Sequence, residues 1–228
     1  YIRDGKLKFY VSEKPLLKSK GISNVERCIT CYDFETGKRE WIFYTAVWGY
    51  IQAVRDFNND GFPEILIVSY APANGVFING RTDLGCGYVF LLDLDGNLIK
   101  QFQFNGIFIK TFAFQLKPDE LIVIGNQSYL FDFCEVYKYN FRTMKINKRF
   151  RFKKAISDFP LICDIDKDGR KEMIVYCYDG YLYVLNDELE VEKSRRLFQP
   201  ETDMHKDSLY LFSANDIDGD GRIELIGL

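Results

Sequence analysis

Residues 164–172 read DIDKDGRKE, and the same pattern returns as DFNNDGFPE at 56–64 and as DIDGDGRIE at 216–224. Each copy has Asp at position 1, Asp or Asn at position 3, Asp-Gly at positions 5 and 6, and Glu at position 9. The last two copies start 52 residues apart, and the first two start 108 apart, which is about twice that distance. The chain therefore repeats with a period of roughly 54 residues, and periods of this length indicate a repeat architecture.

One further copy is expected midway between the first two. Residues 120–124 (ELIVI) match 64–68 (EILIV), which follow the first acidic loop. The residues just before them, 112–116 (FAFQL), carry no carboxylate. We therefore interpret 112–120 as a degenerate copy of the loop that has lost the acidic side chains of its first five positions.

Each period also contains four β-rich stretches. One precedes the acidic loop, a nearly continuous apolar run follows it, and two more are joined by a polar turn. The runs 87–93 and 97–102 around Asp95-Gly96 show this last pattern, which is typical of a β-hairpin. No segment has a sustained helical period. We name the four predicted strands A to D in chain order, with the acidic loop between A and B.

Four antiparallel strands in each repeat are typical of one blade of a β-propeller. The sequence therefore predicts an all-β fold, a β-propeller of four-stranded antiparallel blades, with residues 1–228 as a single propeller domain or a fragment of one. A truncated loop copy at 4–8 opens the chain, and the strand after loop 216–224 closes it, so slightly more than four repeats are present. We expect an arc of a larger propeller. The alternative is a closed four-bladed ring, in which two B strands would compete for one place.

The acidic loops have the residues of a site for a hard cation. Side-chain oxygens at positions 1, 3, 5 and 9 and a backbone carbonyl at position 7 can surround one point, and Gly at position 6 permits a sharp turn. An EF-hand has Glu at position 12, where these copies have Ile67, Val175 and Gly227. We predict about three Ca²⁺ sites, with metal-free Asx turns as the alternative. The predicted ligands are Asp56, Asn58, Asp60, Phe62, Glu64, Asp164, Asp166, Asp168, Arg170, Glu172, Asp216, Asp218, Asp220, Arg222 and Glu224.

Composition narrows the class of protein. Hydrophobic residues make up 47% and charged residues 28% of the chain, which is typical of a soluble globular domain. The net charge of −3 does not favour nucleic acid as a partner, and no apolar run approaches the roughly 20 residues that insert directly into a membrane. Cys28 and Cys31 lie three positions apart in a β-rich run, which favours buried strand cysteines over a metal or redox pair. The only histidine, His205, is assigned no role.

Three other stretches are candidates for contact surfaces. The D strands at 148–154 (KRFRFKK) and 193–196 (KSRR) are strongly basic. Such a strand is either a patch for anionic glycans or an outer edge protected by charge, and we favour the second interpretation. The long connection 71–86, which contains Arg81, is either a ligand-binding loop or a solvated insertion.

The loops resemble the FG-GAP/VCBS repeats of integrin-α-like β-propellers, in loop, strand and period, over essentially the whole chain. Position 9 is Glu here where integrins usually have Asp, and Ala71-Pro72-Ala73 is at most a remnant of the Phe-Gly/Gly-Ala-Pro signature. The resemblance implies the propeller fold and the calcium sites and, less directly, a role in adhesion. Residues 32–41 (YDFETGKREW) also resemble quinoprotein-type propeller repeats. Because only one such copy is present, we interpret Trp41 as blade packing and not as a cofactor contact.

The sequence thus predicts a non-enzymatic, calcium-braced binding or adhesion module that recognises a protein or glycan through inter-blade loops. Millimolar calcium would fill the loops in an extracellular, cell-surface or periplasmic location. One alternative is a calcium-dependent polysaccharide lyase-type propeller enzyme, since certain lyases carry loops similar to 216–221. Another is an intracellular, cytoplasmic scaffold propeller, which six unpaired cysteines would suit. We assign no catalytic residue, and we expect the chain to be part of a larger chain or assembly.

Overall fold

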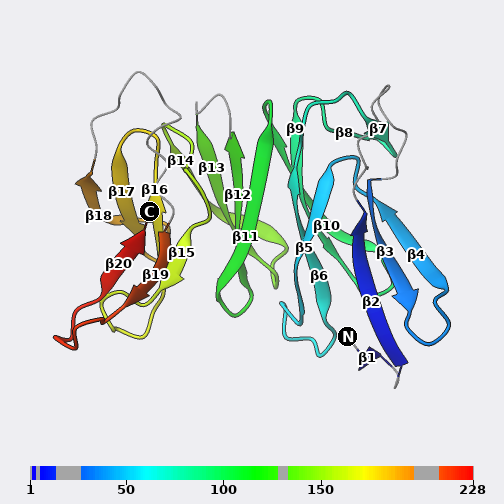
Figure 1. Ribbon diagram of the computed structural model, residues 1–228, viewed down its shortest axis with the longest axis horizontal. Helices are drawn as coiled ribbons and strands as arrows, with labels where there is room; N and C mark the ends of the chain where they lie inside the picture. Colours follow the sequence, from blue (N-terminus) through cyan, green and yellow to red (C-terminus); the bar gives the residue numbers. More distant parts are fainter. Residues whose placement is uncertain (1, 4–5, 14–26, 128–132, 198–210, 228) are drawn as a thin grey trace. The chain divides into compact units, whose positions relative to one another are not determined.

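The computed structural model describes residues 2–3, 6–13, 27–127, 133–197 and 211–227, and their regular secondary structure is all β (Figure 1). Among these residues no helix is long and apolar enough to cross a membrane. The chain divides into two compact units, Tyr1–Ala113 and Phe114–Leu228. The all-β fold predicted from the sequence is therefore confirmed.

The first unit contains two antiparallel blades whose strands pair in the order A-B-C-D. The first blade consists of β1 (Ile2–Arg3), β2 (Lys6–Glu13), β3 (Cys28–Asp33) and β4 (Arg39–Tyr44). The second consists of β5 (Trp48–Arg55), β6 (Glu64–Tyr70), β9 (Cys86–Leu92) and β10 (Leu98–Asn105). A short extra hairpin, β7 (Phe77–Ile78) and β8 (Arg81–Thr82), lies in the connection between strands B and C of the second blade.

The second unit continues the same order. The third blade consists of β11 (Ile109–Lys117), which begins before the unit boundary, β12 (Glu120–Gln127), β13 (Cys134–Asn140) and β14 (Lys145–Phe152). The fourth consists of β15 (Leu161–Cys163), β16 (Glu172–Tyr176), β17 (Tyr181–Leu185) and β18 (Val191–Arg196). A final pair, β19 (Leu211–Asn215) and β20 (Glu224–Gly227), forms the A–B hairpin of a fifth blade. The chain thus folds as four β-propeller blades and the start of another.

The B and C strands form the core of the blades. All residues of β16 are buried, as are all but the last residue of β6 and all but the first of β12. In these three blades the burial confirms the prediction that the apolar B strand is covered on both faces, whereas β20 has no buried residue. Cys28 and Cys31 are both buried on β3, and none of the six cysteines, all of which lie in the described residues, forms a disulfide. The interpretation of the C-x-x-C motif as buried strand residues is therefore confirmed.

Every D strand carries a β-bulge near its start. The extra residue is Glu40 in β4, Ile99 in β10, Asn147 in β14 and Glu192 in β18. A bulge disturbs the hydrogen-bonding pattern and increases the local twist, so another strand pairs less easily with that edge. Edge protection is therefore built into all four complete blades.

Trp41 packs between the first two blades. Its indole Nε1 donates a hydrogen bond to the carbonyl oxygen of Leu94 at 2.9 Å. Its ring covers Gly96, which turns between β9 and β10 with φ of +81°, and a Cβ atom built on Gly96 would lie 2.6 Å from Cδ2 of Trp41. The interpretation of Trp41 as a packing residue agrees with these contacts.

Replacement of Gly96 by alanine should therefore destabilise the first unit. The positive φ and the clash with Trp41 together cost about 1–3 kcal/mol, which lowers the melting temperature of a chain of this size by about 2–10 °C. The matched control is Gly37→Ala, because Gly37 also has positive φ, +65°, but open space where its Cβ would lie. Thermal unfolding followed by circular dichroism measures both variants, and equal melting temperatures would exclude the steric role of Trp41.

The connection 71–86 is folded against the blades and is not a free loop. Asp83 is fully buried and accepts hydrogen bonds from the backbone N–H groups of Asn74 at 3.0 Å and Val76 at 2.7 Å. It also forms an ion pair with the buried guanidinium of Arg27. Arg81, which the sequence placed in a candidate ligand-binding loop, has its guanidinium 4.8 Å from the ring centre of Phe43. The insertion therefore acts first as a structural brace.

The degenerate loop predicted at 112–120 is replaced by a tight hairpin. Strand β11 continues to Lys117 and β12 begins at Glu120, so only Pro118 and Asp119 connect them. Asp119 has φ of +63°, and its carboxylate pairs with Arg142 at 2.5 Å. The truncated copy predicted at 4–8 has its Asp-Gly pair outside the described residues.

Candidate metal centre

The three acidic loops occupy equivalent places in the fold. Loop 56–64 connects β5 to β6, loop 164–172 connects β15 to β16, and loop 216–224 connects β19 to β20. Each therefore joins strand A to strand B, as the repeat predicted. In every copy the Glu at position 9 is the first residue of the B strand, and it is buried in the first two copies (Glu64 and Glu172) and half-buried in the third (Glu224).

The same four hydrogen bonds organise each loop. A carboxylate oxygen at position 1 accepts the N–H of position 6 at 2.8–3.0 Å, and the side-chain oxygen at position 3 accepts the N–H of position 5 at 2.8–3.2 Å. The carboxylate at position 5 accepts the N–H of position 7 at 2.8 Å. The Glu at position 9 accepts the N–H of position 2, also at 2.8 Å. These bonds turn the side chains toward the inside of the loop.

Two left-handed residues make this turn possible. Position 4 has positive φ in all copies, at Asn59, Lys167 and Gly219, and position 6 is a glycine with φ of +88° to +90°. Glycine reaches such angles without a steric penalty, and asparagine tolerates them better than most other residues. Lys167 is less suited to this conformation, and its side chain has a separate contact that is described below.

Acidic side chains converge in each loop. Atoms able to bind a metal lie within 4.8 Å of one another in three groups, one in each loop. The groups are Asp56, Asp60 and Glu64; Asp164, Asp166 and Glu172; and Asp216, Asp218 and Glu224. Positions 1 and 9 thus occur in every group. Oxygen-only groups of this charge suit a hard cation such as Ca²⁺.

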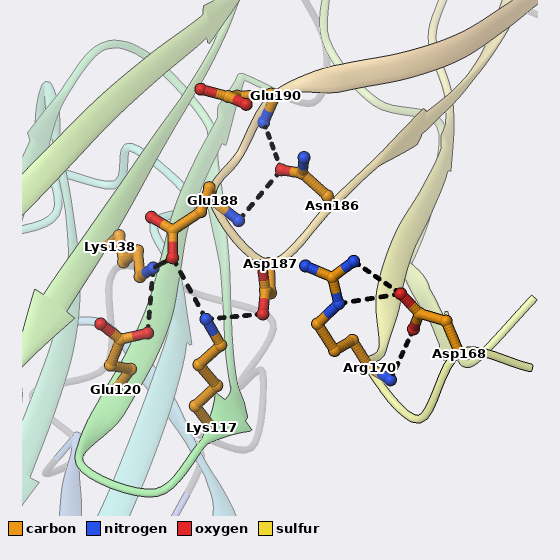
Figure 2. A network of polar contacts seen from close by, with 9 residues as sticks. All are labelled: Lys117, Glu120, Lys138, Asp168, Arg170, Asn186, Asp187, Glu188 and Glu190. Atoms are coloured by element: carbon orange, nitrogen blue, oxygen red, sulfur yellow. Dashed lines mark hydrogen bonds and ion pairs between the residues drawn. The ribbon is translucent and has the colours of Figure 1, made fainter.

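Two of the predicted position 5 ligands lie outside these groups. Asp168 instead accepts hydrogen bonds from the guanidinium of Arg170 at 2.6 and 2.8 Å (Figure 2). Asp220 lies 3.8 Å from the guanidinium of Arg222. The ligand role of the position 7 carbonyls, which belong to Phe62, Arg170 and Arg222, stays a prediction.

A nitrogen donor of the chain approaches the carboxylates in each loop. In the first loop the side-chain amide of Asn58 donates to Asp60 and to Glu64, both at 2.9 Å. In the second, the donor is Arg170. In the third, the ammonium of Lys167 from the preceding loop lies 3.5 Å from Asp216. The acidic side chains of each loop are therefore contacted by a neutral amide in the first loop and by a cationic side chain in the second and third loops.

The burial and charges of the loop carboxylates also favour a bound cation. Burial raises the pKa of Glu64 above its usual range, and the negative charges of Asp60 and Asp56 raise it further. Burial likewise raises the pKa of Glu172, with a further increase from the Asp residues of its own loop. In the third loop, Oδ1 of Asp216 is buried and accepts no hydrogen bond from the described residues. A bound cation would relieve both the repulsion and this missing contact.

A network of ion pairs holds the turn between β17 and β18 of the fourth blade in place. Lys138, which is 2% exposed, pairs with Glu120 at 3.0 Å and with Glu188 at 2.8 Å (Figure 2). Lys117 pairs with Asp187 at 2.6 Å and with the same Glu188 at 3.1 Å. The two lysines lower the pKa of Glu188, with the hydrogen bond from Lys138 as the larger cause. This network connects the third blade to the fourth.

The comparisons with known proteins yield structural likenesses only. No family model matches the sequence, and no curated protein matches it. Among solved structures, the Dos1 propeller aligns over 75% of this chain and 43% of its own, with 11% identity and a TM-score of 0.48. BamB from Moraxella catarrhalis aligns over 76% and 45%, with 12% identity and a TM-score of 0.43.

A protein of unknown function from Bacteroides caccae aligns over 87% of this chain and 61% of its own, with 12% identity and a TM-score of 0.43. The chain thus spans about half the length of the solved structures that it matches. The blade assignment rests on the strand pairing of the chain itself. The finer assignment to FG-GAP/VCBS repeats stays a prediction from the loop sequences.

Proposed function

We propose that this chain is a calcium-braced β-propeller that serves as a non-enzymatic binding module for a protein or a glycan. The observation that carries the proposal is the recurrence of one acidic loop, with the same four hydrogen bonds, in three blades. A single acidic cluster is common on protein surfaces. Three copies at the same place in the fold are better explained by a shared requirement for a cation.

A cation in these loops would act on the fold and not on a substrate. Calcium would supply positive charge between the end of strand A and the start of strand B, because position 1 follows strand A and position 9 begins strand B. The chain's own residues would hold it through positions 1 and 9 in all copies, with position 5 in the first copy and position 3 in the second and third. The bracing would keep the inter-blade connections in place for a ligand.

The proposed location follows from the affinity expected for such loops. Extracellular calcium modules bind with dissociation constants of about 10⁻⁴–10⁻³ M, so they are filled where calcium is millimolar. An extracellular, cell-surface or periplasmic location suits the proposal for this reason. A protein partner is the general expectation, and a role in adhesion is a more specific one.

Calorimetric titration of the chelator-treated chain with calcium chloride tests the proposal. About three equivalents should bind, and the combined substitutions Glu64→Gln, Glu172→Gln and Glu224→Gln should abolish binding because each removes an anchored anionic ligand. The control is Glu35→Gln in an exposed turn. Absence of binding heat and of terbium luminescence would refute the calcium assignment. Release of unsaturated ends from acidic polysaccharides would refute the non-enzymatic role.

Lys167 should weaken calcium binding in the next loop along the chain. Its ammonium donates a hydrogen bond to the carbonyl oxygen of Gly221 at 2.8 Å and lies 3.5 Å from Oδ2 of Asp216. A cation in loop 216–224 would be repelled by this charge. Because both groups are partly exposed, the effect is limited to about 1 kcal/mol, so Lys167→Met should increase the calcium affinity of that loop about two- to fivefold.

The matched control is Lys171→Met, which removes the same charge from the same loop 164–172. Lys171 has no ion pair to loop 216–224. Calcium titration of the two variants therefore separates the contact from the change in net charge. An equal change in affinity in both variants would show that Lys167 acts through general charge alone.

A further inference from the structure

The D strands of the second unit carry a charge that those of the first unit lack. Strand β14 (KINKRFRF) has four cationic residues and no acidic one, and β18 (VEKSRR) has three cationic residues and one acidic one. By contrast, β4 (REWIFY) has one of each sign, and β10 (LIKQFQFN) has a single lysine. The basic charge is therefore a property of particular blades and not of the repeat.

Edge protection does not account for this difference. Each D strand is the outer strand of its blade, and each carries a β-bulge that discourages pairing with another chain. Strand β10 is protected in this way with almost no charge. The interpretation of the basic strands as charge-protected edges, which we favoured from the sequence, is therefore insufficient for β14.

Two arginines of β14 are held in place and face solvent. The guanidinium of Arg149 lies 5.4 Å from the ring centre of Tyr137, and that of Arg151 lies 4.1 Å from the ring centre of Phe133. Among the described residues no carboxylate forms an ion pair with either arginine. Glu135, opposite Arg151 on β13, accepts the hydroxyl of Tyr137 at 3.2 Å instead. The two guanidiniums are thus stacked on aromatic rings, exposed, and without an ion pair among the described residues.

These arginines are also far along the strand from the acidic loops. In an antiparallel A-B-C-D blade, the A–B loop and the C–D turn lie at one end, while strand D runs toward the other. Arg149 and Arg151 belong to the last half of β14, and Lys153 and Lys154 continue beyond it. A hollow of about 300 Å³ at this end is lined by Phe133, Arg151, Phe152 and Lys153. The positive charge at this end of β14 is therefore not placed to neutralise loop 164–172 of the next blade.

We propose that the edge of β14 binds an extended acidic peptide of a protein partner, with carboxylates on Arg149 and Arg151. Alternate residues of an extended strand lie about 6.6–6.8 Å apart, so the two arginines and alternate acidic residues of such a peptide have the same spacing. The regular part of β14 beyond the bulge also offers backbone groups to an added strand, a known mode of peptide recognition. This proposal depends on the proposed function in one respect, because both expect a protein partner.

The same geometry argues against nucleic acids and stacked sugars. Recognition of single-stranded nucleic acid relies on aromatic rings on which bases stack. Here the rings of Tyr137 and Phe133 already have a guanidinium over them. The net charge of −3 also lacks the long-range attraction that nucleic acids require. A carboxylate needs only the exposed N–H groups of each arginine, which stacking leaves available.

Fluorescence anisotropy with three labelled probes tests the proposal on the full chain at physiological salt. The probes are a ten-residue peptide of alternating Thr and Glu, a peptide of five Thr followed by five Glu, and a single-stranded oligothymidine. The alternating peptide should bind at least tenfold more tightly than the block peptide of equal charge. Arg149→Glu with Arg151→Glu should reduce its affinity at least tenfold, while the matched reversal Lys38→Glu with Arg39→Glu in the first blade should leave it unchanged.

Three results would overturn the proposal: equal affinity for both peptides, no loss in the Arg149 and Arg151 variant, or tighter binding of the oligothymidine. Arg149→Gln with Arg151→Gln, checked by its thermal unfolding curve, guards against misfolding of the charge-reversed protein. The readout is separate from calcium titration. Failure of one experiment therefore leaves the other proposal standing.

Discussion

In excess chelator, the chain is expected to melt about 15–30 °C below its melting temperature in saturating calcium. At a free calcium concentration 100 times the dissociation constant, each filled site adds about 2.7 kcal/mol to the free energy of unfolding. Three sites would add about 8 kcal/mol, and each kcal/mol corresponds to about 2–4 °C for a chain of this size. Differential scanning calorimetry in calcium and in chelator measures the shift directly.

The variant with all three position 9 residues changed to glutamine is the control for this prediction. It should melt at the same temperature with and without calcium, while Glu35→Gln should keep the full shift. Identical melting curves of the unmodified protein in calcium and in chelator would contradict the bracing role. Such a result would leave the three loops as metal-free turns.

The calcium effect should also fade in acid. The raised pKa values of Glu64 and Glu172 mean that, without metal, the folded state binds protons at these groups more tightly than the unfolded state does. Their ionised forms therefore destabilise the metal-free fold above the raised pKa, and this cost is relieved as the pH falls through it. Because calcium binds the ionised form, protons compete with it, and the difference between the two melting curves should shrink over the same pH range.

Replacement of Asp83 by alanine is expected to have the second-largest effect. The substitution leaves the guanidinium of Arg27 buried and unpaired, with 3% of its side chain exposed, and removes the acceptor for the N–H groups of Asn74 and Val76. Loss of one partner from a buried ion pair costs about 3–5 kcal/mol. The melting temperature should therefore fall by about 6–20 °C.

Thermal unfolding of Asp83→Ala beside Glu35→Ala measures this effect against an exposed acidic residue. The combined variant Arg27→Met with Asp83→Leu should recover part of the loss, because it removes both charges together. A melting temperature for Asp83→Ala within about 2 °C of the unmodified protein would show that the insertion 71–86 does not brace the first unit.

The period of the acidic loop was enough to predict the blades. Strands A to D appear in the predicted order because their apolar runs are buried on the faces that the pattern indicated, as in β6 and β16. The convergence of positions 1 and 9 was also predictable from spacing alone. Whether a cation occupies the loops was not, because the same oxygens serve a metal site or a metal-free turn.

Other features depend on contacts that no local pattern contains. The hairpin at Pro118-Asp119 was missed because the repeats were aligned without gaps, which assigned nine residues to a loop. A Pro-Asp pair is itself a turn signal. The burial of Asp83 depends on Arg27, which is 56 residues away. The reach of Lys167 into the next loop and the stacking of Arg149 on Tyr137 likewise required the folded chain.

That short hairpin makes the third blade different from its neighbours in one more respect. The entropic cost of closing a loop increases with the number of residues between two paired strands. Two residues separate β11 from β12, whereas eight residues separate β5 from β6 across an acidic loop. No cluster of like charges opposes the pairing. The pairing of β11 with β12 therefore needs no cation, so the proposed calcium requirement does not extend to the third blade.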